Sequence, residues 1–176
     1  MTDLKDIPDE TKWKLAAGCA ARLPAMYDIV FRPAVGKRYE ELEEEIWVEL
    51  GNIASEIAHS LRLPLDNAQE LAESMRMVMT ILFGPDAKGE VIEVGEDGAV
   101  IIVKRCPFLF GGSAVGIPYE RAFHRCLAFN LSSQKKLNPK YASRYVRAIC
   151  MGDRQCEIKV GMDAEKKSKQ DAEKGA

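Results

Sequence analysis

Four of the five cysteines in this chain of 176 residues lie between positions 106 and 156. They are Cys106, Cys126, Cys150 and Cys156. Thiolates bind zinc, iron and iron–sulfur clusters, and an activated thiolate is also a nucleophile. In a reducing compartment, an odd number of cysteines favours metal binding, catalysis or redox sensing over structural disulfides. We therefore predict a metal site on these four residues, either zinc or an iron–sulfur cluster.

The spacing of the cysteines leaves a simpler interpretation open. The Cys150-x5-Cys156 pair is less specific than the Cys-x2-Cys of zinc knuckles, and free cysteine is often just a buried small side chain. Whether Cys150 and Cys156 share one face of a hairpin depends on a register that the sequence does not decide. Helical spacing points Cys126 inward and His124 elsewhere. Cys19 lies in an apolar helical stripe, which predicts a buried side chain rather than a ligand.

The first half of the chain has the periodicity of helices. Apolar residues recur at steps of three and four, which predicts helices over 9–32, about 38–61 and 66–83. Pro24 is expected to bend the first helix, and the segment 33–37 to end it. An acidic run is expected to form a solvated face of the second helix; it comprises Glu40, Glu41, Glu43, Glu44, Glu45 and Glu49.

The second half has the pattern of strands. A hairpin is predicted over 90–104 around Asp97-Gly98, followed by an apolar loop at 108–117, a helix over 119–135 and a second hairpin over 140–160. The predicted fold class is therefore α+β, with N-terminal helices packed against an antiparallel sheet of two hairpins and a further helix. We predict one domain over 1–160, helical in 1–88 and cysteine-bearing in 89–160, followed by a flexible charged tail at 161–176.

Charge is divided unevenly along the chain. Residues 1–102 hold 10 Lys/Arg and 20 Asp/Glu, whereas residues 103–160 hold 11 and 3. The cationic segment favours a small anionic ligand or an acidic protein surface as its partner. An equally good explanation is that the acidic and basic segments attract each other within one fold. We expect no nucleic-acid partner, because the basic residues are not interleaved with stacking aromatics. We also expect a cytoplasmic protein without membrane insertion, because no apolar run nears ~20 residues and residues 1–9 do not read as a secretory signal.

Three motifs follow one another in the second half: Arg105-Cys106-Pro107, then Cys126 with Leu137-Asn138-Pro139, then Gly152-Asp153-x-x-Cys156. With them the chain resembles the aminothiazoline-carboxylate hydrolase-like family, which is related in pattern to vinyl reductase-type domains. Domains of that type bind small hydrocarbons or tetrapyrrole-related molecules. Some hold zinc through Glu-x-x-Cys and the Gly-Asp-x-x-Cys hairpin. The first two of these positions are Tyr145 and Ala148 here, so the resemblance implies that Cys150 takes the place of Ala148.

The resemblance leads to two hypotheses about function. In the first, the chain is a metal or iron–sulfur module that senses a small heterocyclic or anionic ligand, or a partner. In the second, it is a hydrolase that opens a thiazoline ring with metal-bound water or a cysteine nucleophile. A hydrolase also needs a clamp for the substrate carboxylate. Arg125, Arg144 and Arg147 are the candidates, because arginine binds carboxylates in a bidentate manner.

Overall fold

The centre of the structure is a four-stranded antiparallel sheet with the strand order β1-β2-β4-β3. The computed structural model describes residues 3–109 and 118–163. The strands are β1 (Lys88–Glu93), β2 (Gly98–Arg105), β3 (Tyr141–Arg147) and β4 (Cys156–Met162). Two hairpins, β1–β2 and β3–β4, are joined by the pairing of β2 with β4. The predicted α+β fold with two hairpins is therefore confirmed.

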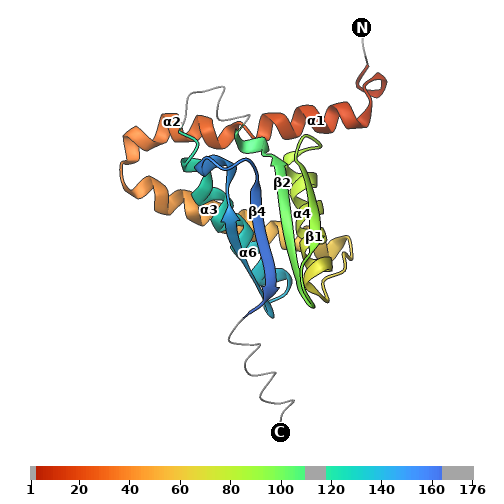
Figure 1. Cartoon of the computed structure of the whole chain (residues 1–176). Coiled ribbons are helices and arrows are strands. Elements are labelled where there is room, and N and C mark those ends of the chain that lie inside the picture. Colours follow the sequence, from red (N-terminus) through yellow and green to blue (C-terminus); the bar gives the residue numbers. More distant parts are fainter. Residues whose placement is uncertain (1–2, 110–117, 164–176) are drawn as a thin grey trace.

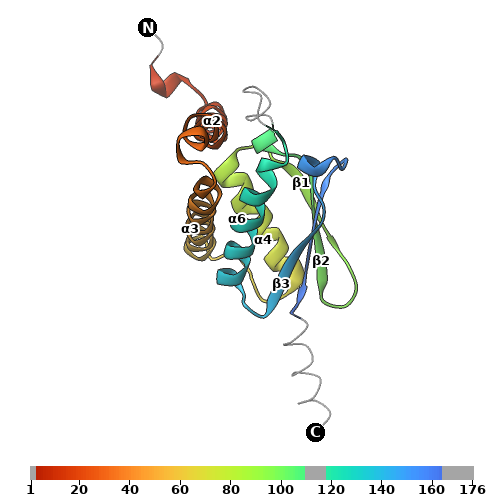
Figure 2. The same ribbon diagram turned by 90° about the vertical axis from the view of Figure 1, so that its left-hand side faces the viewer.

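The helices form layers on one face of this sheet. They are α1 (Asp9–Ala20), α2 (Leu23–Val35), α3 (Arg38–Ser60), α4 (Ala68–Phe83) and α6 (Arg121–Leu137), with short 3-10 turns η1 (Leu4–Asp6) and η2 (Ile149–Met151). Helices α4 and α6 lie against the sheet, and α3 packs on α6 at the outside (Figure 2). Helices α1 and α2 run across one end of these layers (Figure 1).

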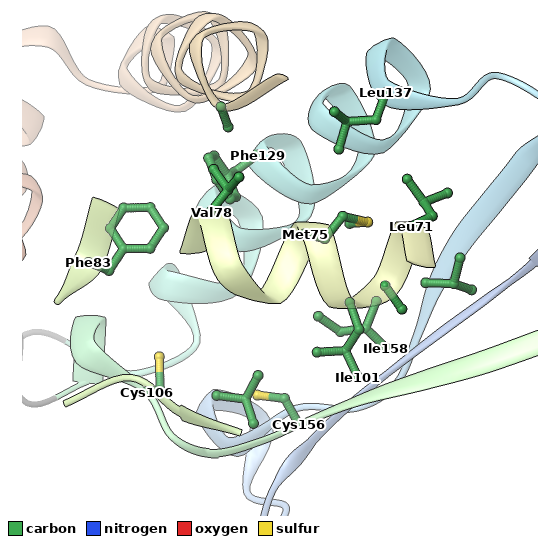
Figure 3. Packing of buried hydrophobic residues seen from close by; sticks show 14 of the residues in the cluster. Leu71, Met75, Val78, Phe83, Ile101, Cys106, Phe129, Leu137, Cys156 and Ile158 are labelled. Carbon is green, nitrogen blue, oxygen red and sulfur yellow. The ribbon is translucent and has the colours of Figure 1, made fainter. Parts of the chain in front are cut away.

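The core lies between α4, α6 and the sheet. Residues at helical spacing on α4, including Leu71, Met75 and Val78, are buried in one cluster with Ile101 and Ile158 of neighbouring strands (Figure 3). Ile101 and Ile158 are directly paired between β2 and β4. Asn67 caps α4 by accepting a hydrogen bond from the Glu70 amide at 2.9 Å, and Gly84 ends the helix with a positive φ of 94°. Local signals and packing thus agree on where α4 begins and ends.

Several boundaries differ from the predictions. The first predicted helix is two helices separated at residues 21–22, and Pro24 lies in the first turn of α2, where its missing amide costs nothing. Helix α2 ends at Val35, inside the segment 33–37 that was expected to end it, and Gly36 follows as its C-cap with a φ of 68°. Strand β4 reaches Met162, which pairs with Tyr141, so the ordered domain extends beyond residue 160. Residues 110–117 of the predicted loop and 164–176 of the predicted tail lie outside the described residues.

Three side-chain predictions need correction. Cys19 is exposed rather than buried, because its side of α1 meets no second layer. Glu43 does not belong to a solvated face: it is buried at the α3–α6 interface and pairs with Arg125. Cys150 lies in η2 and not in a strand, because β3 ends at Arg147. In the portions of the chain that the structure describes, no helix is both long and apolar enough to cross a membrane.

Gly51 allows α3 and α6 to approach closely, which yields a stability test. A Cβ atom at this position would lie 2.7 Å from the Phe129 carbonyl oxygen and would collide with the Ser132 side chain. We expect Gly51→Ala to lower the free energy of unfolding by about 1–3 kcal/mol, because overpacking outweighs the gain in helix propensity. Gly18→Ala in α1 is the matched control, since nothing lies within 4 Å of its Cβ. Urea denaturation that shows Gly51→Ala as stable as Gly18→Ala would contradict this packing.

Candidate functional site

The pairing of β2 with β4 brings two of the cysteines to the same end of the sheet. Cys106 directly follows β2, and Cys156 is the first residue of β4, opposite Val103. Both side chains are buried and belong to the core cluster beneath α4 (Figure 3). The backbone amide of Ile149 donates to the Cys156 sulfur at 3.4 Å, which ties η2 to the start of β4.

The other two predicted cysteines approach the same region from α6 and η2. Cys126 lies beside Cys106, and the two thiols shift each other's pKa in opposite directions. Cys150 is buried on η2, and its pKa is raised to about 12 by burial and by the charges of Cys156 and Cys106. Cys106, Cys126 and Cys156 line one pocket, and Cys150 lies within electrostatic range of it. Four segments that are distant in sequence therefore contribute thiols to one region.

The pocket that these cysteines line is small and largely apolar. Its volume is about 40 Å³, room for roughly one water molecule. Aromatic side chains form the wall away from the sheet: Phe83 and Phe108 have ring centroids 4.5 Å apart, and Phe129 lies 5.3 Å from Phe83. Trp47 packs behind them, with its ring 5.2 Å from that of Phe108. Three phenylalanine rings thus form this wall of the pocket, and Trp47 supports them from behind.

Asn130 and Tyr145 supply polar atoms to the pocket. The Asn130 amide nitrogen donates to the Tyr145 hydroxyl oxygen at 2.7 Å and to the Cys126 carbonyl at 2.8 Å. The Asn130 carbonyl oxygen Oδ1 is buried and has no hydrogen-bond partner among residues 3–109 and 118–163. Such an acceptor is uncommon in a protein interior and invites a donor. We did not predict Asn130 as a site residue, although its position one helical turn after Cys126 was a usable signal.

Cys106 is the most acidic thiol of the group. The interaction with Cys126 outweighs burial and, with the backbone amides of Leu109 and Phe108, lowers the pKa of Cys106 to about 7. The same interaction and burial raise the pKa of Cys126. Burial also raises the pKa of Tyr145, and the nearby thiols add to that effect. The site therefore holds one thiol that ionises near neutrality beside partners that stay protonated.

The structure does not bring the three predicted clamp arginines together. Arg125 is buried on α6 and binds Asp28 of α2 at 2.8 Å and Glu43 of α3 at 2.7 Å. Arg144 and Arg147 lie exposed on β3, and Arg147 pairs with Glu157 at 3.0 Å. The role of these arginines in substrate binding stays a prediction.

The metal prediction also stays a prediction. In the described portions of the chain, no three His, Cys, Asp or Glu side chains form a group arranged to hold a metal ion. The donor chemistry nevertheless suits zinc or an iron–sulfur cluster, because thiolates are soft ligands. The position that the family resemblance assigns to a glutamate ligand, Tyr145, does line the pocket. Ala148 is buried beside η2, where its amide donates to Asp153 at 2.8 Å.

Comparison with solved structures identifies proteins of similar fold. No protein-family model matches the chain, and no curated protein matches it. Subunit 3 of the trafficking protein particle complex from Naegleria fowleri, covalently bound to palmitic acid, superposes with a TM-score of 0.58 at 16% identity, covering 82% of this chain and 96% of the other. The phenol-responsive sensory domain of the transcription activator PoxR, with phenol, gives 0.52 at 10% identity, covering 88% and 79%. At these identities the likeness concerns the fold alone.

The acidity of Cys106 can be tested by alkylation. We expect the rate at which iodoacetamide modifies Cys106 to rise with pH around a midpoint near 7. Cys126→Ala removes the neighbouring thiol and should move this midpoint upward, toward the ordinary thiol value, whereas Cys19→Ala should leave it in place. Peptide mass spectrometry across a pH series measures both. An unchanged midpoint in Cys126→Ala would show that Cys126 does not stabilise the thiolate.

Proposed function

We propose that this chain is a binding module for a small, mostly apolar molecule that carries one hydrogen-bond donor, and that the cysteine-lined pocket is its site. The observation that carries the proposal is the buried Asn130 Oδ1, which lacks a partner among the described residues and is carried by a residue that lines the pocket. A ligand hydroxyl or N–H would satisfy this acceptor, while its apolar part would meet Phe83, Phe108 and Phe129.

The size of the pocket sets a condition on binding. At about 40 Å³ it does not admit a ring without movement of its wall. Phe83 and Phe108 separate it from a larger apolar groove of about 610 Å³ and line both spaces. A shift of these two rings toward the groove would open the pocket without disturbing the sheet. Ligand binding is therefore expected to move the aromatic cluster around Trp47.

The two comparison proteins support a ligand of this class. The PoxR sensory domain is described with phenol, and the trafficking subunit is covalently bound to palmitic acid. Both ligands are largely apolar and carry an oxygen at one end. The sequence led us to expect a small anionic or heterocyclic ligand, whereas the pocket suits a mostly apolar one. Phenol is a suitable probe because it combines one aromatic ring with one hydrogen-bond donor.

Phenol and benzene form a matched pair of probes. We expect phenol to bind more tightly than benzene by about 1–2 kcal/mol, or roughly 5- to 30-fold, because only phenol can donate to Asn130. In Asn130→Leu, which lacks the acceptor, the two affinities should become equal. Isothermal titration calorimetry measures the difference. Movement of the aromatic cluster can be followed by fluorescence. The chain has 2 tryptophans, so in Trp13→Phe the emission comes from Trp47 alone and should change when phenol binds.

A control variant tests whether the effect is specific to the pocket. Lys136→Leu changes an exposed side chain on α6 that does not line the pocket, and it should preserve the preference for phenol. Binding of neither probe would contradict the proposal, and so would equal affinities in the unmodified chain. If Asn130→Leu proves unstable, the comparison of phenol with benzene on the unmodified chain remains decisive.

A metal bound by the cysteines is the second candidate function, favoured by four thiols that influence one another's ionisation. Cys106, Cys126, Cys150 and Cys156 would hold a zinc ion or an iron–sulfur cluster, which would fix these segments of the fold to one another. The hydrolase hypothesis would instead use Cys106 as the nucleophile, together with residues that bind the carboxylate of the substrate. Opening of a thiazoline ring is the reaction to assay.

Metal content separates these possibilities directly. Protein purified without air should contain roughly one zinc ion, or the iron of one cluster, per chain if the thiols are ligands. Cys106→Ser, Cys126→Ser and Cys156→Ser should each deplete it, because every ligand removed weakens the site. Cys19→Ser is the control, since Cys19 is exposed on α1. Elemental analysis that finds no metal in the unmodified chain would overturn the metal candidate.

A further inference from the structure

Helix α2 turns its charged side chains inward. Of the residues in LPAMYDIVFRPAV only Asp28 and Arg32 are charged, and Asp28 is completely buried. Its carboxylate accepts hydrogen bonds from Arg32 at 2.9 and 3.0 Å, from Arg121 at 2.6 Å and from Arg125 at 2.8 Å. These bonds fix one face of α2 to α6. The remaining faces of the helix are consequently left without a charge.

The outward faces of α2 are apolar and exposed. A helix at the surface of a monomer normally presents polar residues to water. Here the exposed large side chains of α2 are all apolar, and they are Leu23, Met26, Tyr27, Ile29, Val30, Phe31 and Val35. This pattern is the inverse of a solvated helix and is typical of a surface that another molecule covers.

The neighbouring helix extends the same surface. Leu23, Tyr27 and Phe31 of α2 recur every four residues and form one wall of a groove, and Leu42, Ile46 and Leu50 of α3 form the opposite wall. The groove has a volume of about 610 Å³. Beside it, Met26, Ile29 and Val30 form an exposed ridge on α2. One continuous patch therefore contains both a groove and a ridge.

The size of this patch fits a stable protein interface. Its ten exposed large apolar side chains, which include Leu42, Ile46 and Ile53 of α3, are each about half exposed. Since a large side chain buries on the order of 200 Å² when fully covered, ten half-exposed side chains offer roughly 1,000 Å². The largest apolar patch of a typical monomer is about 300–600 Å², whereas each partner of a standard interface contributes about 800 Å².

From these features we infer that the α2–α3 face is covered by a second copy of this chain. A twofold contact uses the same patch on both copies, so the patch must complement itself. The ridge and groove satisfy this in shape. Charge agrees: the centre is uncharged, while the rim carries Arg22 and Lys37 at the ends of α2 and Glu45 and Glu49 along α3. Copies can thus meet with opposite charges at the rim and without like charges at the centre.

The pairing has a consequence for the pocket beside the cysteines. Phe83 and Phe108 separate that pocket from the groove, so a partner seated in the groove would lie against the wall that ligand entry must move. The pairing itself does not depend on any ligand. Its test is therefore independent of the phenol experiment.

The test measures the mass of the full chain in solution by sedimentation equilibrium. We expect twice the chain mass of 19.6 kDa. Val30→Arg on the ridge and Ile46→Arg in the groove place a charge in the proposed interface, at side chains that are 63% and 66% exposed. Each should weaken the dimer at least tenfold without unfolding the chain, because neither side chain belongs to the core. Circular dichroism confirms the fold of each variant.

Val146→Arg is the matched control. Val146 is 53% exposed on β3, away from the α2–α3 face, and the substitution adds the same charge. This variant should stay dimeric. An unmodified chain that stays monomeric at about 100 µM would overturn the inference, because an interface of standard area associates well below that concentration. If the chain is monomeric and binds phosphatidylcholine vesicles, the face belongs to a membrane contact instead. If Val30→Arg or Ile46→Arg dimerises as tightly as Val146→Arg, the dimer interface lies elsewhere.

Discussion

Backbone hydrogen bonds between β2 and β4 join two local hairpins into one sheet, and the positions of Cys106 and Cys156 in the pocket follow from that pairing. The register sets Val103 opposite Cys156, so the end of β2 and the start of β4 lie side by side. Cys106 continues from one strand, η2 with Cys150 precedes the other, and α6 crosses above them with Cys126. A shift of one residue would turn Cys156 away from the helices, because strand side chains alternate between faces.

Buried charge organises the opposite side of the helical layer. Burial by itself would raise the pKa of Asp28, but Arg32 and Arg121 outweigh it and lower that pKa, so the carboxylate stays ionised inside the protein. Burial raises the pKa of Glu43, and Arg125 opposes that shift. A buried ion pair seldom adds much net stability, yet losing one partner leaves a costly unpaired charge. The cluster is therefore best understood as fixing α2 on α3 and α6, which leaves the apolar faces of α2 outward.

The sequence predicted what local chemistry determines. Helical periodicity located α3 and α4, and the Asp97-Gly98 turn between β-branched runs located the first hairpin. It did not predict contacts between distant residues. Glu43 has the same local pattern as the exposed acids around it, and only Arg125, 82 positions away, shows why it is buried. Arg125 was for the same reason interpreted as a ligand clamp. Asn130 was missed because its unpaired oxygen is a property of the assembled pocket.

Oxidative crosslinking of Cys106 to Cys126 tests most directly whether these thiols meet. The two residues lie 20 positions apart in sequence, on different elements, and a disulfide forms only between sulfurs that can approach bonding distance. Diamide treatment of Cys19→Ser protein, followed by trypsin digestion and mass spectrometry, should yield a linked peptide pair that contains Cys106 and Cys126. If all four remaining thiols can still be alkylated after diamide treatment, or if Cys106 forms no disulfide within the chain, this pocket does not exist in solution.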